Sequence, residues 1–150
     1  MTSISLHEFE EWLEAYGAAW RAGDAQAVTE LFTGDAQYYE TPFGDPLRGS
    51  EAIFRYWIAG PGRSQSEVSF SFQALAAVEG MGIARWQASF VRRRSGRRVE
   101  LDGCLVAEFA HPGKCTVFRE WWHRREPGGV SSEHPRSSTE PGRSRESGNS

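Results

Sequence analysis

The chain has 150 residues, a net charge of −3 and 13% aromatic residues, among them 6 Trp and 9 Phe. This length predicts a single domain, and the acidic balance argues against a general polyanion-binding protein. No apolar run approaches the length of a membrane-spanning helix, and the N-terminus lacks the basic and apolar regions of a signal peptide. Cys104 and Cys115 are not spaced as a metal-binding pair. We therefore expect a cytoplasmic protein with reduced thiols and with no metal or other cofactor.

The first part of the chain predicts helices. A capping box begins at Ser5, apolar residues then recur at helical spacing, and Gly23 suits the C-terminal end of this first helix. A second, short helix is expected over about 25–32, where apolar residues again share one face. A third helix is expected over 51–58 with Ser50 as its N-cap, and the segment that follows it is expected to be a loop.

The segment DAQYYET, residues 35–41, predicts a strand because aromatic residues cluster there and a proline ends it. Side chains alternate between the two faces of a strand, so Glu40 shares a face with Tyr38. If Tyr38 faces the core, Glu40 faces an apolar pocket and becomes a candidate base. The alternative is that Glu40 lies on the surface, at the end of a strand that leads into the loop PFGDPLRG.

From about residue 67 the apolar pattern changes to a period of two, which predicts strands. They are EVSFSFQALA, GIARWQASFV, VELDGCLVAEFA and CTVFREWWH, with a hairpin turn expected at Ser95 and Gly96. Helices followed by a strand meander favour an α+β domain over residues 1–126, with the helices on one face of a curved sheet. Residues 127–150 contain almost nothing apolar, and we expect them to be disordered.

Two stretches carry a resemblance to a known family: YGAAWRAGDAQAVTELFTGDAQYYETPFGDPLRGSEAIFRYW, and ELDGCLVAEF followed by CTVFREWWH. Over about residues 5–125 the chain resembles the nuclear transport factor 2-like superfamily, and within it the SnoaL-like and ketosteroid-isomerase-like branch. The resemblance implies a cone-shaped α+β fold, with three N-terminal helices packed on a curved antiparallel or mixed sheet. It also implies a pocket between helices and sheet, and homodimers formed through the outer sheet face.

Ketosteroid isomerase uses a carboxylate base, together with a tyrosine and a protonated aspartic acid that stabilise an oxyanion. The resemblance places the tyrosine at Tyr16 and the base at Glu40, or at Thr41 if the segment PFG is aligned instead. The aspartic acid falls on Leu105, which cannot donate a hydrogen bond, so a true ketosteroid isomerase is excluded. The epoxide-hydrolase branch of the superfamily needs an Arg-x-Asp strand, and no predicted strand has that sequence.

Glu40 and Glu120 form the candidate catalytic pair. Glu120 lies between Phe118 and Trp122 on a strand face that predicts a pocket, and two carboxyl groups in an aromatic cavity favour protonation of one of them. One acid and one base would result, as proton transfer requires. The alternatives are that Glu40 lies at the pocket rim and that Glu120 pairs with an arginine. Tyr16 is the candidate donor to an oxyanion, or else a core residue.

The expected pocket wall is aromatic, as is usual for small-molecule sites. Its residues are Trp20, Tyr38, Phe54, Trp57, Trp86, Phe90, Leu105, Phe118 and Trp122. On the opposite sheet face, Arg119 and Trp121 are expected at a homodimer interface. The arginines of RRRSGRR are expected to form a solvated hairpin tip, and we expect neither a nucleic-acid nor a membrane partner.

These observations predict that the chain binds a small cyclic or aromatic molecule in an aromatic-lined pocket. The first hypothesis is cofactor-independent proton transfer of the isomerase, cyclase or dehydratase type, with Glu40 as base, Glu120 as partner acid and Tyr16 as oxyanion donor. The second is a ligand-binding module without turnover. The third is a dimeric interaction domain whose pocket is filled by its own side chains.

Overall fold

The computed structural model describes residues 3–126 of the chain. Its elements are α1 (Leu6–Ala22), α2 (Ala25–Thr29), β1 (Phe32–Tyr39), β2 (Leu47–Arg48), α3 (Gly49–Trp57), a π-helical turn (Ile58–Gly62), β3 (Gln65–Val78), β4 (Met81–Arg92), β5 (Arg98–His111) and β6 (Lys114–Arg125). The tail over 127–150, which was expected to be disordered, lies outside the described residues. Within the described part, no helix is both long enough and apolar enough to span a membrane.

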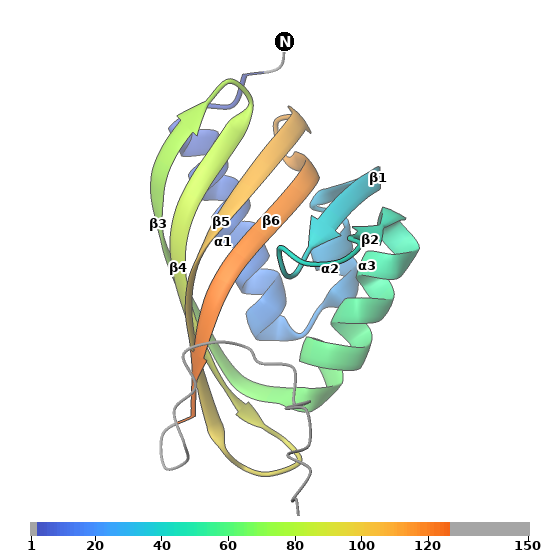
Figure 1. Ribbon diagram of the computed structural model, residues 1–150, viewed down its shortest axis with the longest axis vertical. Helices are drawn as coiled ribbons and strands as arrows, with labels where there is room; N and C mark the ends of the chain where they lie inside the picture. Colours follow the sequence, from blue (N-terminus) through green and yellow to red (C-terminus); the bar gives the residue numbers. More distant parts are fainter. Residues whose placement is uncertain (1–2, 127–150) are drawn as a thin grey trace, which may run out of the picture.

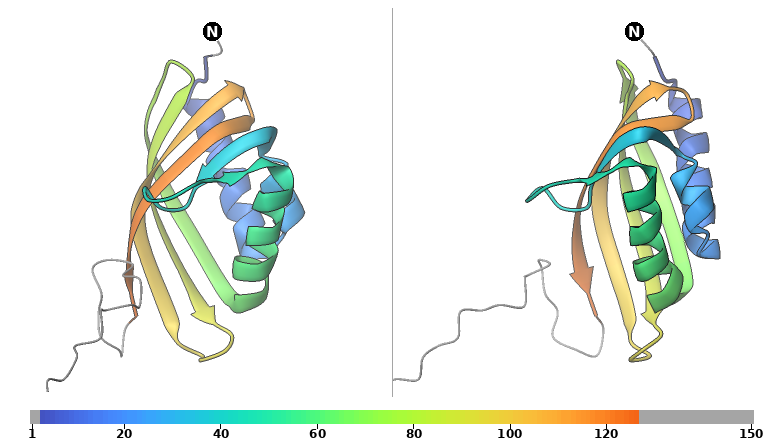
Figure 2. Two further views of the ribbon diagram at one scale, coloured as in Figure 1. Left: turned by 45° about the vertical axis from the view of Figure 1, so that its right-hand side comes forward. Right: turned by 90° about the vertical axis from the view of Figure 1, so that its right-hand side faces the viewer.

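The strands form one 6-stranded sheet in the order β2-β1-β6-β5-β4-β3. Strands β3 to β6 form an antiparallel meander, whereas β1 pairs with β6 in parallel, so the sheet is mixed. Figures 1 and 2 show the sheet curving strongly, with α1 and α3 gathered on one side of it. The expected α+β architecture, with three helices on one face of a curved mixed sheet, is therefore confirmed.

Helix α1 supplies the largest part of the helical layer, and its ends are those that the sequence predicts. The Ser5 hydroxyl accepts a hydrogen bond from the Glu8 amide at 3.0 Å, and the Glu8 carboxylate accepts one from the Ser5 amide. Gly23 ends the helix with φ of +65°, a left-handed conformation that glycine adopts without steric cost. The buried face of α1 consists of Phe9, Trp12, Leu13, Tyr16, Gly17, Ala19 and Trp20.

Three expected boundaries are wrong. The second helix ends at Thr29, because Phe32 starts β1 and packs its ring edge-on against Trp12 at 5.7 Å. The third helix begins before Ser50: its N-cap position is Arg48, with no side-chain cap, and Gly49 turns the chain there with φ of +83°. The expected loop after this helix starts instead with a π-helical turn over 58–62.

Gly103 in the middle of β5 makes room for large aromatic side chains on the inner sheet face. It pairs with Trp86 of β4 on one side and with Trp122 of β6 on the other. A Cβ atom at this position would lie 2.2 Å from the carbonyl oxygen of Trp121 and 2.8 Å from Cβ of Trp122. Because the carbonyl belongs to the backbone, a methyl group here would force the β5–β6 ladder to shift.

We expect Gly103→Ala to lower the free energy of unfolding by about 1–3 kcal/mol, the usual cost of overpacking. Chemical denaturation monitored by circular dichroism would measure this change. Gly34→Ala is the matched control, since nothing lies within 4 Å of a Cβ placed on that β-strand glycine. Equal stability of the two variants would contradict the steric argument.

Candidate functional site

A cavity of about 190 Å³ lies between the helices and the inner face of the sheet. It is lined by Tyr16, Trp20, Tyr38, Glu40, Tyr56, Trp57, Pro61, Gln65, Trp86, Phe90, Arg92, Leu101, Glu120, Trp122 and Arg124. Gln65 begins β3, Arg92 ends β4, and Arg124 lies one residue before the end of β6. These three residues place the mouth of the cavity at one end of the curved meander.

All three residues predicted to carry chemistry line this cavity, as do most residues of the predicted wall. Phe54, Leu105 and Phe118 do not. Leu105 and Phe118 are fully buried in the core, where the Phe118 ring stacks on that of Tyr38 at 4.7 Å. Phe54 is only half-buried on α3, because Ile53 and Trp57, one helical turn apart, form the buried stripe of that helix.

Six lining residues were not predicted: Tyr56, Pro61, Gln65, Arg92, Leu101 and Arg124. For the two arginines a signal was present in the sequence. Period-two alternation carries Phe90 to Arg92 and Trp122 to Arg124, so each arginine shares the face of an expected pocket residue. For Tyr56 no such signal exists, since it neighbours Trp57 on a helix and packs against it edge-on at 6.1 Å.

Two tyrosine hydroxyls meet at the inner end of the cavity. The Tyr16 and Tyr38 oxygens lie 3.4 Å apart, and both side chains are buried. Burial raises the pKa of each hydroxyl, and Glu120, once ionised, would raise both further. Both groups therefore stay protonated and can donate hydrogen bonds to a developing negative charge.

Glu120 lies beside these tyrosines and is only 8% exposed. Burial raises the pKa of its carboxyl well above the ordinary value, and the charge of Glu40 raises it further. Among residues 3–126, no arginine forms an ion pair with it. Burial therefore favours the neutral, protonated form of the Glu120 carboxyl, which faces an aromatic cavity.

Glu40 lies directly after the end of β1 and is half-buried at the cavity wall. The parallel register pairs Tyr38 with Phe118 and Tyr39 with Arg119, so one further step brings Glu40 level with Glu120. Adjacent strands are about 4.8 Å apart, which places the two side chains on neighbouring strands of one face. The indole N–H of Trp122 donates to the Glu40 carbonyl at 3.3 Å and holds this turn against β6.

Tyr56 connects Glu40 to the rest of the cavity wall. Burial is the main cause that raises the pKa of its hydroxyl. Ionised Glu120 and Glu40 would raise this pKa further, as does a side-chain hydrogen bond with Glu40. The two carboxyl groups therefore differ in environment: Glu120 is buried, whereas Glu40 is half-buried and has the Tyr56 hydroxyl as a partner. Such a difference allows one carboxyl to act as acid and the other as base.

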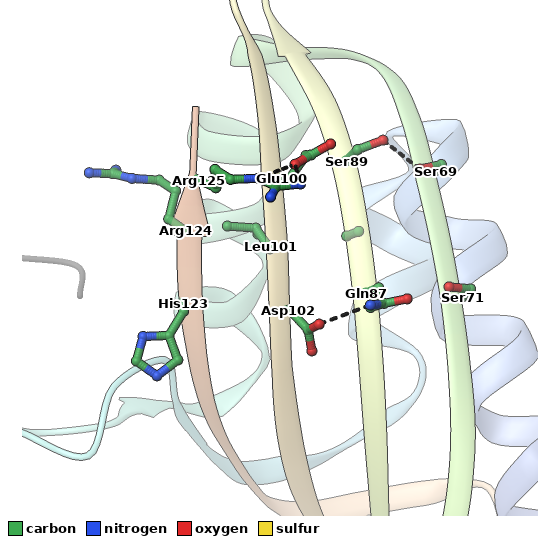
Figure 3. Close-up of a pocket in the computed structure, with 11 residues that line it drawn as sticks. Ser69, Ser71, Gln87, Ser89, Glu100, Leu101, Asp102, His123, Arg124 and Arg125 are labelled. Carbon is green, nitrogen blue, oxygen red and sulfur yellow. Dashed lines mark hydrogen bonds and ion pairs between the residues drawn. The ribbon is translucent and has the colours of Figure 1, made fainter. Parts of the chain in front are cut away.

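A larger hollow of about 860 Å³ lies on the opposite face of the sheet (Figure 3). Several of its polar side chains already have partners: Asp102 accepts hydrogen bonds from Gln87 and from the neighbouring Arg85, and the Ser69 and Ser89 hydroxyls lie 2.6 Å apart. The hydrogen bonds with Arg85 and Gln87 lower the pKa of Asp102. Because these groups are satisfied on an open surface without aromatic walls, the smaller inner cavity is the better candidate site.

Within the described residues, no three His, Cys, Asp or Glu side chains cluster so that they could hold a metal ion. The indole N–H groups of Trp57 and Trp86 are buried, and neither donates a hydrogen bond to any of residues 3–126. Both indoles pack edge-on against the Trp20 ring, at 5.7 and 5.9 Å.

The raised pKa of Glu120 has a consequence for stability. The folded state disfavours the ionised carboxyl, so stability is greatest below its ordinary pKa of 4.5 and falls as the pH rises toward the folded pKa. In the wild type, the free energy of unfolding should fall by up to about 1.4 kcal/mol for each pH unit over this range, and we expect Glu120→Gln to abolish this fall. Denaturant unfolding over about pH 5–8 would measure this slope. Glu10→Gln, on the exposed face of α1, is the control. Parallel curves for wild type and Glu120→Gln would contradict the assignment.

Comparison with known proteins agrees with this architecture. Residues 13–118, well over half of the chain, match the family model described as SnoaL-like domain. One matching solved structure is that of the epoxide hydrolase/cyclase-like enzyme SalBIII, described for pyran ring formation in polyether salinomycin. It is 21% identical with a TM-score of 0.66, and the match covers 75% of this chain and 88% of that one. No curated protein sequence matches significantly. With its three helices, curved mixed sheet and inner cavity, the chain belongs to the SnoaL-like domain family.

Proposed function

We propose that this protein binds a small cyclic or aromatic molecule in the inner cavity and transfers a proton on it without a cofactor, as an isomerase, cyclase or dehydratase does. The observation that carries this proposal is the pair of carboxyl groups, Glu40 and Glu120, in one aromatic cavity but in unequal environments. A molecule bound between them would meet a base at the rim and an acid at the inner end.

In this proposal Glu40 removes a proton from a carbon or hydroxyl of the ligand, and Glu120 supplies one. Tyr16, supported by its contact with the Tyr38 hydroxyl, donates a hydrogen bond to the oxyanion that forms. The position where a protonated aspartic acid would lie in ketosteroid isomerase is Leu105, and its direct partner across the β5–β6 ladder is Glu120. In this proposal the neutral carboxylic acid is therefore Glu120 of β6, on the strand next to Leu105.

The size of the cavity limits the ligand. About 190 Å³ is less than the ~300–1,000 Å³ typical of drug-sized ligands and more than the ~150 Å³ of a cavity that accepts benzene. A molecule with one or two rings fits this range. The family and the epoxide hydrolase/cyclase-like neighbour support an isomerase or cyclase type of reaction. The same small volume supports the alternative of an interaction domain whose cavity is filled by its own aromatic side chains.

A hydrogen-exchange assay tests the catalytic proposal without knowledge of the natural substrate. Cyclohexanone and indanone would be incubated with the protein in heavy water, and deuterium uptake at the carbon next to the carbonyl would be followed by NMR. We expect uptake above the buffer rate for at least one ketone, and a fall of about 10²-fold or more in Glu40→Gln, the usual contribution of a general base.

Glu51→Gln is the control for this assay, because Glu51 lies on the exposed side of α3 and pairs with Arg55. Uptake equal to the buffer rate for both ketones, or uptake unchanged in Glu40→Gln, would remove the catalytic assignment and favour a binding or interaction role.

We also propose that the outer sheet face pairs two copies of the chain. Trp121 is 45% exposed there, and Arg119 lies over the Tyr39 ring at 4.2 Å, so an aromatic and cationic surface faces outward. Trp and Arg are the residues most enriched at protein interfaces. The half-buried Val106, which pairs with Arg119, adds apolar surface to the same face.

We expect sedimentation experiments at micromolar concentration to show a dimer for the wild type and a monomer for Trp121→Glu, because a buried unpaired charge is strongly disfavoured at an interface. Phe43→Glu is the control, since Phe43 is 84% exposed on the loop after β1. A monomeric wild type would contradict the proposed interface.

A further inference from the structure

Two arginines at the mouth of the cavity share one carboxylate. Arg92 and Arg124 both line the cavity, and both approach Glu126, the residue after β6. Nη2 and Nε of Arg92 lie 3.0 and 3.3 Å from one oxygen of Glu126, and Nε of Arg124 lies 3.9 Å from the same oxygen. All three side chains are partly buried, which reduces the screening of their charges by water.

This cluster is unbalanced in both charge and geometry. Among the described residues, this cluster holds two positive groups and one negative group, so the cluster itself carries a net positive charge. A guanidinium binds a carboxylate best through two parallel hydrogen bonds to two different oxygens. Here both nitrogens of Arg92 contact a single oxygen, and the Arg124 contact is long. Glu126 therefore occupies the arginine pair without using its full capacity to bind a carboxylate.

We infer that the cavity takes ring molecules that carry a carboxylate, which Arg92 and Arg124 bind at the mouth after displacing Glu126. This inference rests on the proposed function, because it names the ligand class of the same cavity. The ring would lie among the indoles of the wall, and the carboxylate would point toward the open end, where β4 and β6 end.

The arrangement of charges gives such a ligand one orientation. Glu40 and Arg124 lie on either side of Trp122. The Trp122 indole donates a hydrogen bond to the Glu40 carbonyl, and Arg124 follows two residues later on the same strand face. A ligand carboxylate is attracted to the arginine side and repelled from Glu40. Binding in this orientation leaves the far part of the ring against Glu120 and the tyrosine hydroxyls, where proton transfer is proposed.

Matched probes test this inference on the full chain. Isothermal titration calorimetry would compare para-ethylbenzoate with para-ethylbenzamide, which has nearly the same shape and no charge. We expect the carboxylate to bind about tenfold more tightly or better, as charge-assisted hydrogen bonds are roughly twice as strong as neutral ones. We also expect this preference to shrink at about 0.5 M salt, because screening weakens partly exposed ion pairs.

Variants locate the effect. Arg92→Gln and Arg124→Gln should each weaken benzoate binding about tenfold and benzamide binding much less, because the amide carbonyl accepts only weaker, neutral-acceptor hydrogen bonds. Glu126→Gln should strengthen benzoate binding several-fold by removing the internal competitor. Arg97→Gln, at the exposed tip of the β4–β5 hairpin, is the control and should change neither affinity. Thermal unfolding of each variant would show that it is folded.

The possible results separate the inference from the proposed function. If wild type binds both probes equally, or if the arginine variants weaken both probes alike, the carboxylate inference is wrong while the ligand cavity stands. If neither probe binds at millimolar concentration, both the inference and the proposed ligand cavity are wrong. The comparison of probes on wild type needs no variant, so a poorly folding substitution leaves the test intact.

Discussion

The structure depends on one constraint, which is the burial of the Glu120 carboxyl inside an aromatic core. A charged carboxylate at this depth would be strongly disfavoured, so the group is held neutral. The hydroxyls of Tyr16, Tyr38 and Tyr56 around it are also held in their protonated forms by burial. The inner end of the cavity is thus polar but uncharged, whereas Arg92 and Arg124 line its mouth.

Leu105 and Glu120 show how one fold can move a functional group without moving its backbone. They are direct partners on the β5–β6 ladder, and both side chains are buried on the inner face. A carboxylic acid on either strand would therefore point into the same region between helices and sheet. This agrees with the principle that function is set by the residues of a site and not by the fold that carries it.

Much of the fold and part of the site followed from the sequence, because period-two alternation and capping patterns are local. Alternation placed Glu120 and Trp122 on the inner face, but it contains no information on depth, so Phe118 was assigned to the wall although it lies in the core. Phe32 fits the helical spacing of Val28 and Leu31, so local pattern extends the second helix over it, but it begins β1 and packs against Trp12, which is distant in the chain. The parallel pairing of β1 with β6 could not be predicted from local patterns, although it aligns the two carboxyl groups.

That parallel pairing also determines when the site forms during folding. Residues 38 and 118 are partners across the β1–β6 ladder, so the contact that brings the carboxyl groups together closes a long loop. Closing such a loop costs chain entropy before any contact offsets it, and long-range pairings of this kind form slowly. Local helices and hairpins can therefore form before the two carboxyl groups meet. A ligand that needs both groups would recognise only the completed domain, and its binding would stabilise the whole chain against unfolding.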